Sequence, residues 1–249
     1  MRKSLFFSAC VIVALTGLAR AAAIDPGLTG TTQYDGWASL TSGSYPGYGF
    51  FPGSTAWPSP IVSNQTGSAD ATFNKTAGAA YPAGSGLYFG GFSDTPNNYG
   101  GTLAVADATP VAGLANVVFQ LETLQAYGYD LYNDALPTLS YNSGSQALEG
   151  VLGGITSEVY NGTFPTPDGE KPLYVHTYLL QWDLTSLGAI TDFTITWSNV
   201  QHSQIYSLRL DQSDSYSLLD VTFIPEPASI ALLALGAGAM LRRRRMSGN

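Results

Sequence analysis

The sequence predicts an all-β fold, with one antiparallel β-sandwich or jelly-roll domain in the middle of the chain. Only 11 % of the residues are charged, and helix-type periodic blocks of Ala, Leu, Glu, Lys and Arg do not occur between residues 24 and 224. Short runs that alternate apolar and polar residues do occur there, and Gly, Pro, Asn and Ser separate them. Many short strands divided by turn residues are typical of sandwiches and jelly rolls.

The first 23 residues predict a secretory signal peptide. Arg2 and Lys3 supply a positive start, and an apolar run covers Leu5–Leu18. Two stretches place small residues where signal peptidase reads them, Ala19-Arg20-Ala21 and Ala21-Ala22-Ala23. We therefore expect signal peptidase to remove this segment during export. The single cysteine, residue 10, lies inside it, so we expect no disulfide, thiolate metal site or cysteine nucleophile in the mature chain.

Residues 24–224 are expected to form one acidic domain with a sizeable core. They contain 17 of the 18 acidic residues and only three basic residues, Lys75, Lys171 and Arg209, which gives a net charge of −14. Such a domain is not expected to bind nucleic acid or anionic lipid by charge. The simplest explanation of the acidity is that it keeps the domain soluble outside the cell. The charge is also compatible with binding of divalent cations or neutral polymers.

Strands are expected, in chain order, at Thr102–Ala106, Asn116–Thr123, Leu136–Tyr141, Pro172–Leu184, Asp192–Ser198, Ile205–Leu210 and Ser217–Phe223. The fourth is apolar on both faces, as a central strand is. In the fifth, Phe193, Ile195 and Trp197 share one face, which is a clean period of two. Only residues 185–189 join these two strands, so the sequence predicts that they form a hairpin.

The segment from residue 27 to residue 101 is rich in Gly, Ser, Pro and Tyr. A flexible linker has such a composition, but disordered segments are usually poor in aromatic residues. We therefore expect long ordered loops with a few edge strands here. No repeat of fixed period occurs, which argues against a solenoid or a propeller.

The sequence contains no catalytic constellation, so we expect the protein not to be an enzyme. No Ser has Gly both two residues before and two residues after it, and the two histidines do not form a zinc-binding His-Glu-x-x-His pattern. His176 lies in a predicted central strand, where a hydrogen-bonded core histidine is expected, and His202 lies in a predicted turn at a strand end. A glycan-active hydrolase needs only two carboxylates and remains an alternative, although the sequence selects no pair.

Two clusters of side-chain oxygens are candidate calcium ligands, because calcium takes Asp, Asn and carbonyl oxygens in loops. The first contains Asp130, Asn133 and Asp134, and the second contains Asp211 and Asp214. Neither matches the twelve-residue EF-hand loop. Asp and Asn also cap turns without any metal, which is the alternative interpretation.

Aromatic side chains are candidates for sugar binding, since exposed rings on a β-sandwich act as stacking platforms for sugars. Trp37 and Trp57 lie in the Gly/Pro/Tyr-rich segment, whose loops could expose them, and His202 lies in its turn. We take these three as candidate ligand-binding residues. The alternative is that the tryptophans pack underneath the loops.

The last 25 residues, 225–249, predict a C-terminal sorting helix. Pro225, Glu226 and Pro227 precede an apolar run over Ala228–Leu241, and four basic residues follow it: Arg242, Arg243, Arg244 and Arg245. The run has 14 residues, fewer than the roughly 20 of a straight membrane span, but arginine stems can snorkel to lengthen it. Arginines stay on the cytoplasmic side. A buried C-terminal helix is the alternative, which four consecutive arginines fit badly.

This order of proline pair, apolar run and arginine cluster, over residues 224–245, resembles the PEP-CTERM sorting signal of Gram-negative and related bacteria. The resemblance implies that an exosortase-type membrane transpeptidase reads the tail and cuts near Pro-Glu-Pro. It also implies a surface or matrix protein of a bacterium that makes exopolysaccharide. Residues 197–213 are similar to the last strands before the signal in planctomycete-type members, which implies a shared sandwich; no activity is carried over from this similarity.

Together these features predict an exported surface or extracellular-matrix protein, held to the membrane by its C-terminal helix, with a structural or adhesive role. The alternative function is an exopolysaccharide-binding module, which would depend on calcium if the Asp clusters bind it.

Overall fold

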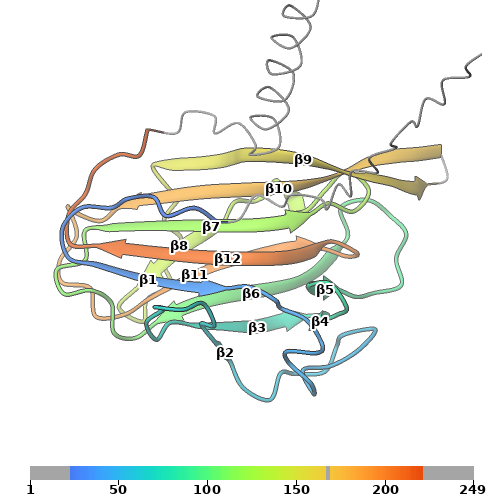
Figure 1. The fold of residues 1–249 in the computed structure, drawn as a ribbon, viewed down its shortest axis with the longest axis horizontal. Coiled ribbons are helices and arrows are strands. Elements are labelled where there is room, and N and C mark those ends of the chain that lie inside the picture. The colour runs from blue at the N-terminus through green and yellow to red at the C-terminus, as the bar shows by residue number, and fades with distance from the viewer. Residues whose placement is uncertain (1–22, 167–168, 221–249) are drawn as a thin grey trace, which may run out of the picture.

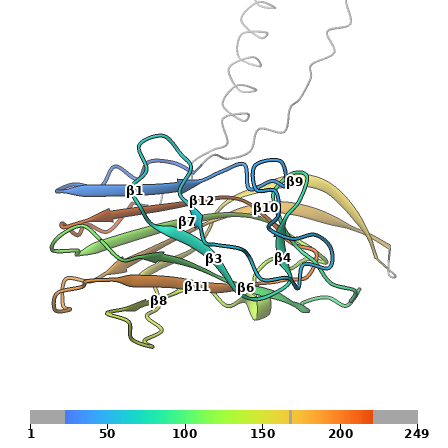
Figure 2. The ribbon, with the colours of Figure 1, turned by 90° about the horizontal axis from the view of Figure 1, so that it is seen from below.

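The computed structural model describes residues 23–166 and 169–220, which form two antiparallel sheets stacked in two layers (Figures 1 and 2). The described residues include no α-helix, which confirms the all-β prediction. Nor, within these ranges, is there a helix long and apolar enough to cross a membrane. Except for residue 23, the predicted signal peptide lies outside the described residues, and so does the predicted sorting helix.

The strands and the one short 3-10 helix, η1, have the following bounds: β1 (Thr32–Trp37), β2 (Ile61–Val62), β3 (Thr72–Gly78), β4 (Ala80–Pro82), β5 (Leu87–Phe89), β6 (Tyr99–Asp107), β7 (Asn116–Leu124), η1 (Tyr132–Asp134), β8 (Thr138–Tyr141), β9 (Leu152–Thr166), β10 (Gly169–Asp183), β11 (Phe193–Val200) and β12 (Gln204–Ser213).

The larger sheet has seven strands in the order β4-β5-β12-β7-β10-β9, and β1 pairs with the second half of β12 beside β5. The smaller sheet has five strands in the order β2-β3-β6-β11-β8. All ladders between these strands are antiparallel. The chain crosses between the sheets repeatedly, so neighbouring strands in sequence often lie in different layers.

The hydrophobic core lies between the two sheets, where alternate residues of each strand meet. Val117, Phe119 and Leu121 of β7 are fully buried on its inner face. The Phe119 ring lies 5.2 Å from the ring of Trp197, which belongs to β11 in the other sheet. On its own sheet, Trp197 stacks on Phe73 at 6.0 Å with an interplanar angle of 3°. Burial of these large rings is the main driving force for joining the layers.

Six of the seven predicted strands are confirmed as β6, β7, β8, β10, β11 and β12. The seventh, Ser217–Phe223, is wrong for residues 217–220, which have no strand structure, and its last three residues lie outside the described ranges. The side chain of Gln181 explains this, because it donates to the Ser217 carbonyl at 2.8 Å and accepts from the Leu219 N–H at 2.9 Å. An amide side chain therefore takes the place of a strand partner.

The predicted hairpin between the fourth and fifth strands is also wrong. β10 pairs with β7 and β9, whereas β11 pairs with β6 and β8 in the other sheet. The connection over residues 184–192 thus crosses from one layer to the other. A period of two reveals that one face of β11 is buried, but both layers bury their inner faces against the same core, so the pattern does not identify the sheet.

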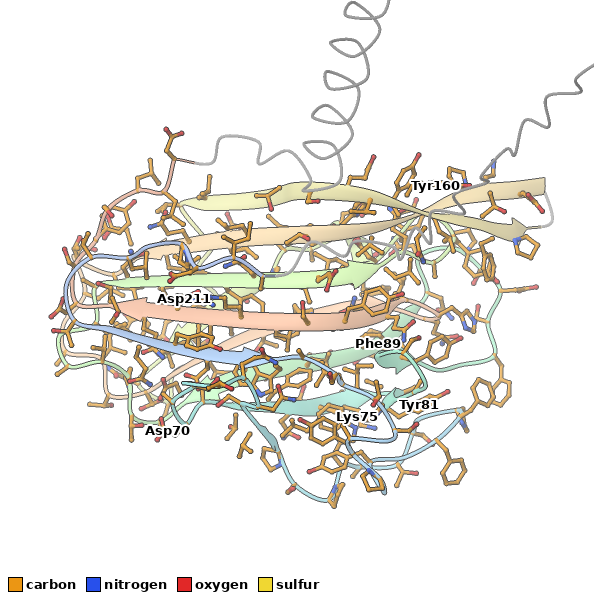
Figure 3. All side chains as sticks on the ribbon, viewed as in Figure 1. Asp70, Lys75, Tyr81, Phe89, Tyr160 and Asp211 are labelled. Carbon is orange, nitrogen blue, oxygen red and sulfur yellow. The ribbon has the colours of Figure 1, made fainter. Side chains whose placement is uncertain are left out.

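The Gly/Pro/Tyr-rich segment contains β1 to β5 and long ordered loops, as predicted. Asn64 ties two loops together because its amide donates to the Tyr45 hydroxyl at 2.7 Å. Lys75 of β3, labelled in Figure 3, donates to the carbonyls of Gly53 and Thr55. Backbone groups in these loops are therefore satisfied by specific side chains rather than by a sheet ladder.

Candidate functional site

A row of aromatic rings lies at the end of the seven-stranded sheet where β12 begins. Successive ring centroids are 5.8 Å apart for Tyr81 and Tyr88, 6.0 Å for Tyr88 and His202, 6.1 Å for His202 and Tyr127, and 4.8 Å for Tyr127 and Phe164. These five residues come from β4, β5, the β11–β12 turn, the loop after β7, and β9. Figure 3 shows Tyr81 at this end of the molecule and Asp211 of β12 toward the other end.

The row borders a cavity of about 240 Å³. Its lining residues are Tyr88, Leu124, Gln125, Ala126, Tyr127, Phe164, Leu173, His202 and Gln204. We name the row and this cavity the aromatic groove. None of the lining residues is Asp, Glu, Lys or Arg, although the surrounding domain carries a net charge of −14. The groove is therefore an uncharged site on an acidic domain.

His202 is fixed in the groove by contacts to both ring nitrogens. Its Nε2–H donates to the Ser93 carbonyl at 2.7 Å, which only accepts, and the Tyr88 hydroxyl lies 2.6 Å from Nδ1. The backbone is also held, because the His202 N–H donates to the Phe89 carbonyl at 2.7 Å. The residue adopts a left-handed conformation with φ 70°. The predicted turn position of His202 is confirmed.

Tyr127 is presented by a tight turn that follows β7. Ala126 and Tyr129 pair across this turn, which leaves Tyr127 and Gly128 at its centre with φ values of 54° and 88°. Two positive φ values at the centre of a two-residue loop favour Asn or Gly, so a tyrosine there is strained. Two ring-bearing residues of the groove, Tyr127 and His202, thus both have left-handed backbones. Such outliers cluster at functional sites.

The groove also has polar neighbours for directional bonds. The Gln204 amide donates to the Ser85 hydroxyl at 2.9 Å, and the Gln125 amide donates to the Gly128 carbonyl at 3.2 Å. Burial raises the pKa of the Tyr88 hydroxyl, with smaller contributions from Tyr81 and Tyr127, so this hydroxyl stays protonated at neutral pH. The site therefore combines apolar ring faces with neutral hydrogen-bonding groups.

The sequence prediction that Trp37 and Trp57 are exposed is wrong. They are 0 % and 9 % exposed, and each indole N–H donates to a backbone carbonyl at 3.1 Å, that of Ile61 for Trp37 and that of Ala80 for Trp57. Both rings contact Phe73 in the core. When the indole N–H donates to an internal carbonyl, the whole tryptophan ring can be buried without leaving a polar group unsatisfied.

Asp130, a predicted calcium ligand, belongs instead to a buried charged cluster. Its carboxylate accepts from the Tyr178 hydroxyl and the Leu131 N–H, and lies 2.9 Å from His176 Nδ1. His176 Nε2 lies 3.0 Å from a Glu158 oxygen. Burial lowers the pKa of His176, but Asp130 and then Glu158 outweigh it and raise the pKa above the usual 6.5. We name this set the His176 cluster.

The other candidate calcium ligands lie apart in the fold. Asn133 and Asp134 are exposed at η1, and Asn133 exchanges hydrogen bonds with Asn97. Asp211 accepts two hydrogen bonds from Arg209, at 2.7 and 2.8 Å, and Asp214 accepts from the Thr31 N–H at 2.8 Å. No group of three or more His, Cys, Asp or Glu side chains in the described ranges is arranged to hold a metal ion. Calcium binding at the two predicted clusters stays a prediction.

In a comparison with protein families, the model of the PEP-CTERM protein-sorting motif matches residues 223–245. The chain carries a PEP-CTERM sorting motif. This confirms the resemblance on which Pro225, Glu226, Pro227 and Arg242–Arg245 were selected, although these residues lie outside the described ranges. The motif marks an exported protein that an exosortase-type enzyme processes during membrane-anchored sorting. Comparisons with curated proteins and with solved structures found no match.

Sequence reasoning missed four of the five ring residues, namely Tyr81, Tyr88, Tyr127 and Phe164. They come from separate strands and loops, and only the fold brings them together. One local signal was available, because Ala126-Tyr127-Gly128-Tyr129 follows the predicted strand Asn116–Thr123 and its glycine indicates a turn that would carry a tyrosine at its tip.

Proposed function

We propose that this exported protein is a non-enzymatic surface protein that binds a neutral polysaccharide in the aromatic groove. The observation that supports this most directly is the pair of left-handed residues, Tyr127 and His202, whose rings lie 6.1 Å apart beside the cavity. Strained backbones that hold rings in fixed positions favour a site built for a ligand.

The chemistry of the groove favours sugar as the ligand. Pyranose rings present apolar C–H faces that pack on aromatic rings, and hydroxyl groups that bond to neutral side chains such as Gln204. The ring row leads from Tyr81 to Phe164 across five strands or turns, so it suits an extended chain better than a single sugar. The uncharged lining within a strongly acidic domain disfavours anionic glycans, which the domain as a whole would repel.

The absence of catalytic groups from the groove supports a binding role. Glycoside hydrolysis needs two carboxylates near the scissile bond, and the groove is lined by none. Elsewhere, Asp130 and Glu158 flank His176 and are engaged with its two nitrogens, which leaves the imidazole no free nitrogen to act as a base.

A binding assay with the purified exported protein tests the proposal. The probes are immobilised neutral polysaccharides, namely β-glucan, mannan and the producing cell's own exopolysaccharide, with alginate as the anionic comparison. We expect Tyr127→Asn to weaken binding at least tenfold, about 1.4 kcal/mol. Asn tolerates the left-handed turn, so this variant removes the ring without unfolding the loop. Phe50→Ala is the control, because Phe50 is 77 % exposed and lies outside the ring row.

The outcomes separate the proposal from its alternatives. Equal binding by Tyr127→Asn and wild type would remove the groove from consideration. No binding to any glycan would favour a purely structural surface role. Because the groove is lined by no carboxylate, we expect the same affinity with calcium and with EDTA. Loss of binding in EDTA would instead support the calcium-dependent alternative.

A further inference from the structure

Two exposed phenylalanine rings meet beside the Tyr81 end of the aromatic groove. Phe51 and Phe92 are 43 % and 82 % exposed, and their ring centroids lie 5.0 Å apart with an interplanar angle of 88°. They come from separate segments, the loop between β1 and β2 and the loop between β5 and β6. We name them the phenylalanine pair. Exposure of an apolar ring to water is unfavourable, so two such rings in contact mark a candidate binding surface.

A tight turn presents Phe51 next to Tyr81. The Gly53 N–H donates to the Phe50 carbonyl at 2.7 Å, which places Phe51 at the tip of the turn. Gly53 lies against Tyr81, because a Cβ atom at Gly53 would be 2.7 Å from Tyr81 Cδ1. Lys75 anchors the turn through its ammonium group, which donates to the Gly53 carbonyl at 2.7 Å. Figure 3 labels Tyr81 and Lys75 at this end of the molecule.

The loop that carries Phe92 is held by the groove itself. On one side of Phe92, the Ser93 carbonyl accepts from the Nε2–H of His202 at 2.7 Å. On the other side, Gly90 lies against Tyr81, because a Cβ atom at Gly90 would be 3.2 Å from Tyr81 Cε1. The backbone on both sides of Phe92 therefore contacts ring residues of the groove, which fixes its position relative to them.

Chain geometry limits how far the phenylalanine pair can lie from the ring row. Phe51 is two residues from Gly53, and Phe92 is two residues from Gly90. Two residues span at most about 7 Å. Both glycines lie against Tyr81, the last ring of the row. The pair therefore continues the row beyond Tyr81.

We propose that the phenylalanine pair is an outer subsite of the aromatic groove, and that the ligand is a neutral polymer long enough to run from the cavity past Tyr81 onto this pair. The inference rests on the proposed polysaccharide binding and defines its substrate class, which is long chains rather than short oligosaccharides. A short oligosaccharide fills the cavity beside Tyr127 and His202 and gains nothing from the pair. A long chain covers both, so the exposed apolar faces are removed from water.

The chemistry of the pair favours an uncharged chain over other partners. The segments 49–53 and 90–93 contain no Asp, Glu, Lys or Arg. The ammonium group of Lys75 is engaged by two backbone carbonyls. A second copy of the chain would bring together two domains that each carry a net charge of −14, which disfavours self-association. Phenylalanine offers no hydrogen bond, so the pair raises affinity for long chains while the polar groups around the cavity select the sugar.

The test compares chain lengths of one glycan on the purified exported protein. The probes are the neutral polysaccharide that binds best and a ladder of oligosaccharides made from it by partial hydrolysis, each titrated calorimetrically. We expect Phe92→Ala to weaken binding of the polymer about five- to tenfold, about 1.0–1.4 kcal/mol, and to leave binding of the shortest oligosaccharides unchanged. Tyr127→Asn should weaken binding at every length. Phe92→Tyr keeps the ring and should bind like the wild type.

A matched control comes from the same turn. Phe50 is 77 % exposed and adjacent to Phe51, but it is not a member of the pair, so Phe50→Ala should bind every length like the wild type. Because Phe92 is exposed, Phe92→Ala should also melt at the wild-type temperature. Weaker binding by this variant then reports the lost ring and not a loss of folding.

The outcomes distinguish this inference from the proposed function. If Tyr127→Asn loses affinity while Phe92→Ala binds the polymer normally, the groove binds glycan and the outer subsite is refuted. Equal weakening of short and long chains by Phe92→Ala also refutes it, because the ring would then belong to the cavity. If no glycan binds the wild type, the proposed function fails and this inference fails with it. Self-association that Phe92→Ala abolishes would assign the pair to a second copy and overturn the proposal.

Discussion

The His176 cluster allows a sharp prediction, because the same imidazole contacts one buried and one exposed carboxylate. Asp130 has 4 % of its side chain exposed and Glu158 has 53 %. Replacement His176→Leu removes the cation and leaves Asp130 buried, with the Tyr178 hydroxyl and the Leu131 N–H as its donors. Replacement Glu158→Gln removes only the solvent-facing charge. We expect very different losses of stability from the two variants.

The magnitudes follow from burial. Removal of one partner from a buried ion pair costs about 3–5 kcal/mol, because the remaining charge is left without its counterion. A pair whose carboxylate is half exposed contributes about 0–1 kcal/mol, since water screens it. For a domain of about 200 residues, 1 kcal/mol corresponds to roughly 2–4 °C in melting temperature. His176→Leu should therefore lower the melting temperature by about 6–20 °C, and Glu158→Gln by less than about 4 °C.

The pH dependence gives this prediction a second signature. The pKa of His176 in the folded state lies above its unfolded value of 6.5, through Asp130 and then Glu158 acting against burial. Its contribution to stability is therefore complete below pH 6.5 and is lost as the pH rises through the raised folded pKa. The stability difference between wild type and His176→Leu should be largest near pH 6 and smaller at pH 9.

Urea unfolding, followed by tryptophan fluorescence, measures both effects. Trp182 and Trp197 are 1 % and 3 % exposed, so unfolding transfers both indoles to water. Equal destabilisation by His176→Leu and Glu158→Gln would refute the argument, since burial of Asp130 would then not determine the cost. A difference that grows from pH 6 to pH 9 would show that His176 is not held as a cation.

Three further predictions concern the core, a buried acid and the sorting motif. Trp197→Ala should destabilise the domain by about 3–5 kcal/mol in urea unfolding, because its ring packs on Phe73 and on Phe119 of the opposite sheet. Burial, and secondarily nearby Asp107, raises the pKa of Asp35, so its ionisation opposes folding as the pH rises. Asp35→Asn should therefore raise the melting temperature at pH 8 and leave it unchanged at pH 3; an equal shift at both values would contradict this. Deletion of residues 242–245 should abolish surface display, and unchanged display of an epitope-tagged chain would argue against their role in sorting.

Strand positions were predictable from the sequence because a sheet strand has a local period of two. Phe193, Ile195 and Trp197 identify β11 without any knowledge of its partners. Sheet membership was not predictable, since β11 and β12 are joined by only three residues and still belong to different sheets. The turn at Gln201–Ser203 resembles a hairpin turn in sequence. Only the ladders to β6 and β7 reveal that it joins two layers.

The candidate site was harder to predict because its residues have no common spacing. His202 was selected from its turn position, but Trp37 and Trp57 were selected as exposed and are buried. Trp37 and Trp57 are buried because each indole N–H donates to an internal carbonyl. Tyr127, by contrast, lies at the tip of a turn with a left-handed backbone and is excluded from strand packing. Backbone geometry at turns therefore predicts ring exposure better than residue type does.

The position of the groove relative to the sorting motif agrees with a surface role. β12 begins just after His202 and ends at Ser213, ten residues and about 30 Å away. The described chain then remains at that far end, because Ser217 and Leu219 bind Gln181 near the end of β10, as Figure 1 shows. The motif at residues 223–245 follows directly. The described chain therefore ends, at residue 220, at the end of the domain opposite the aromatic groove, which is the arrangement that our proposal of polysaccharide binding by a surface protein requires.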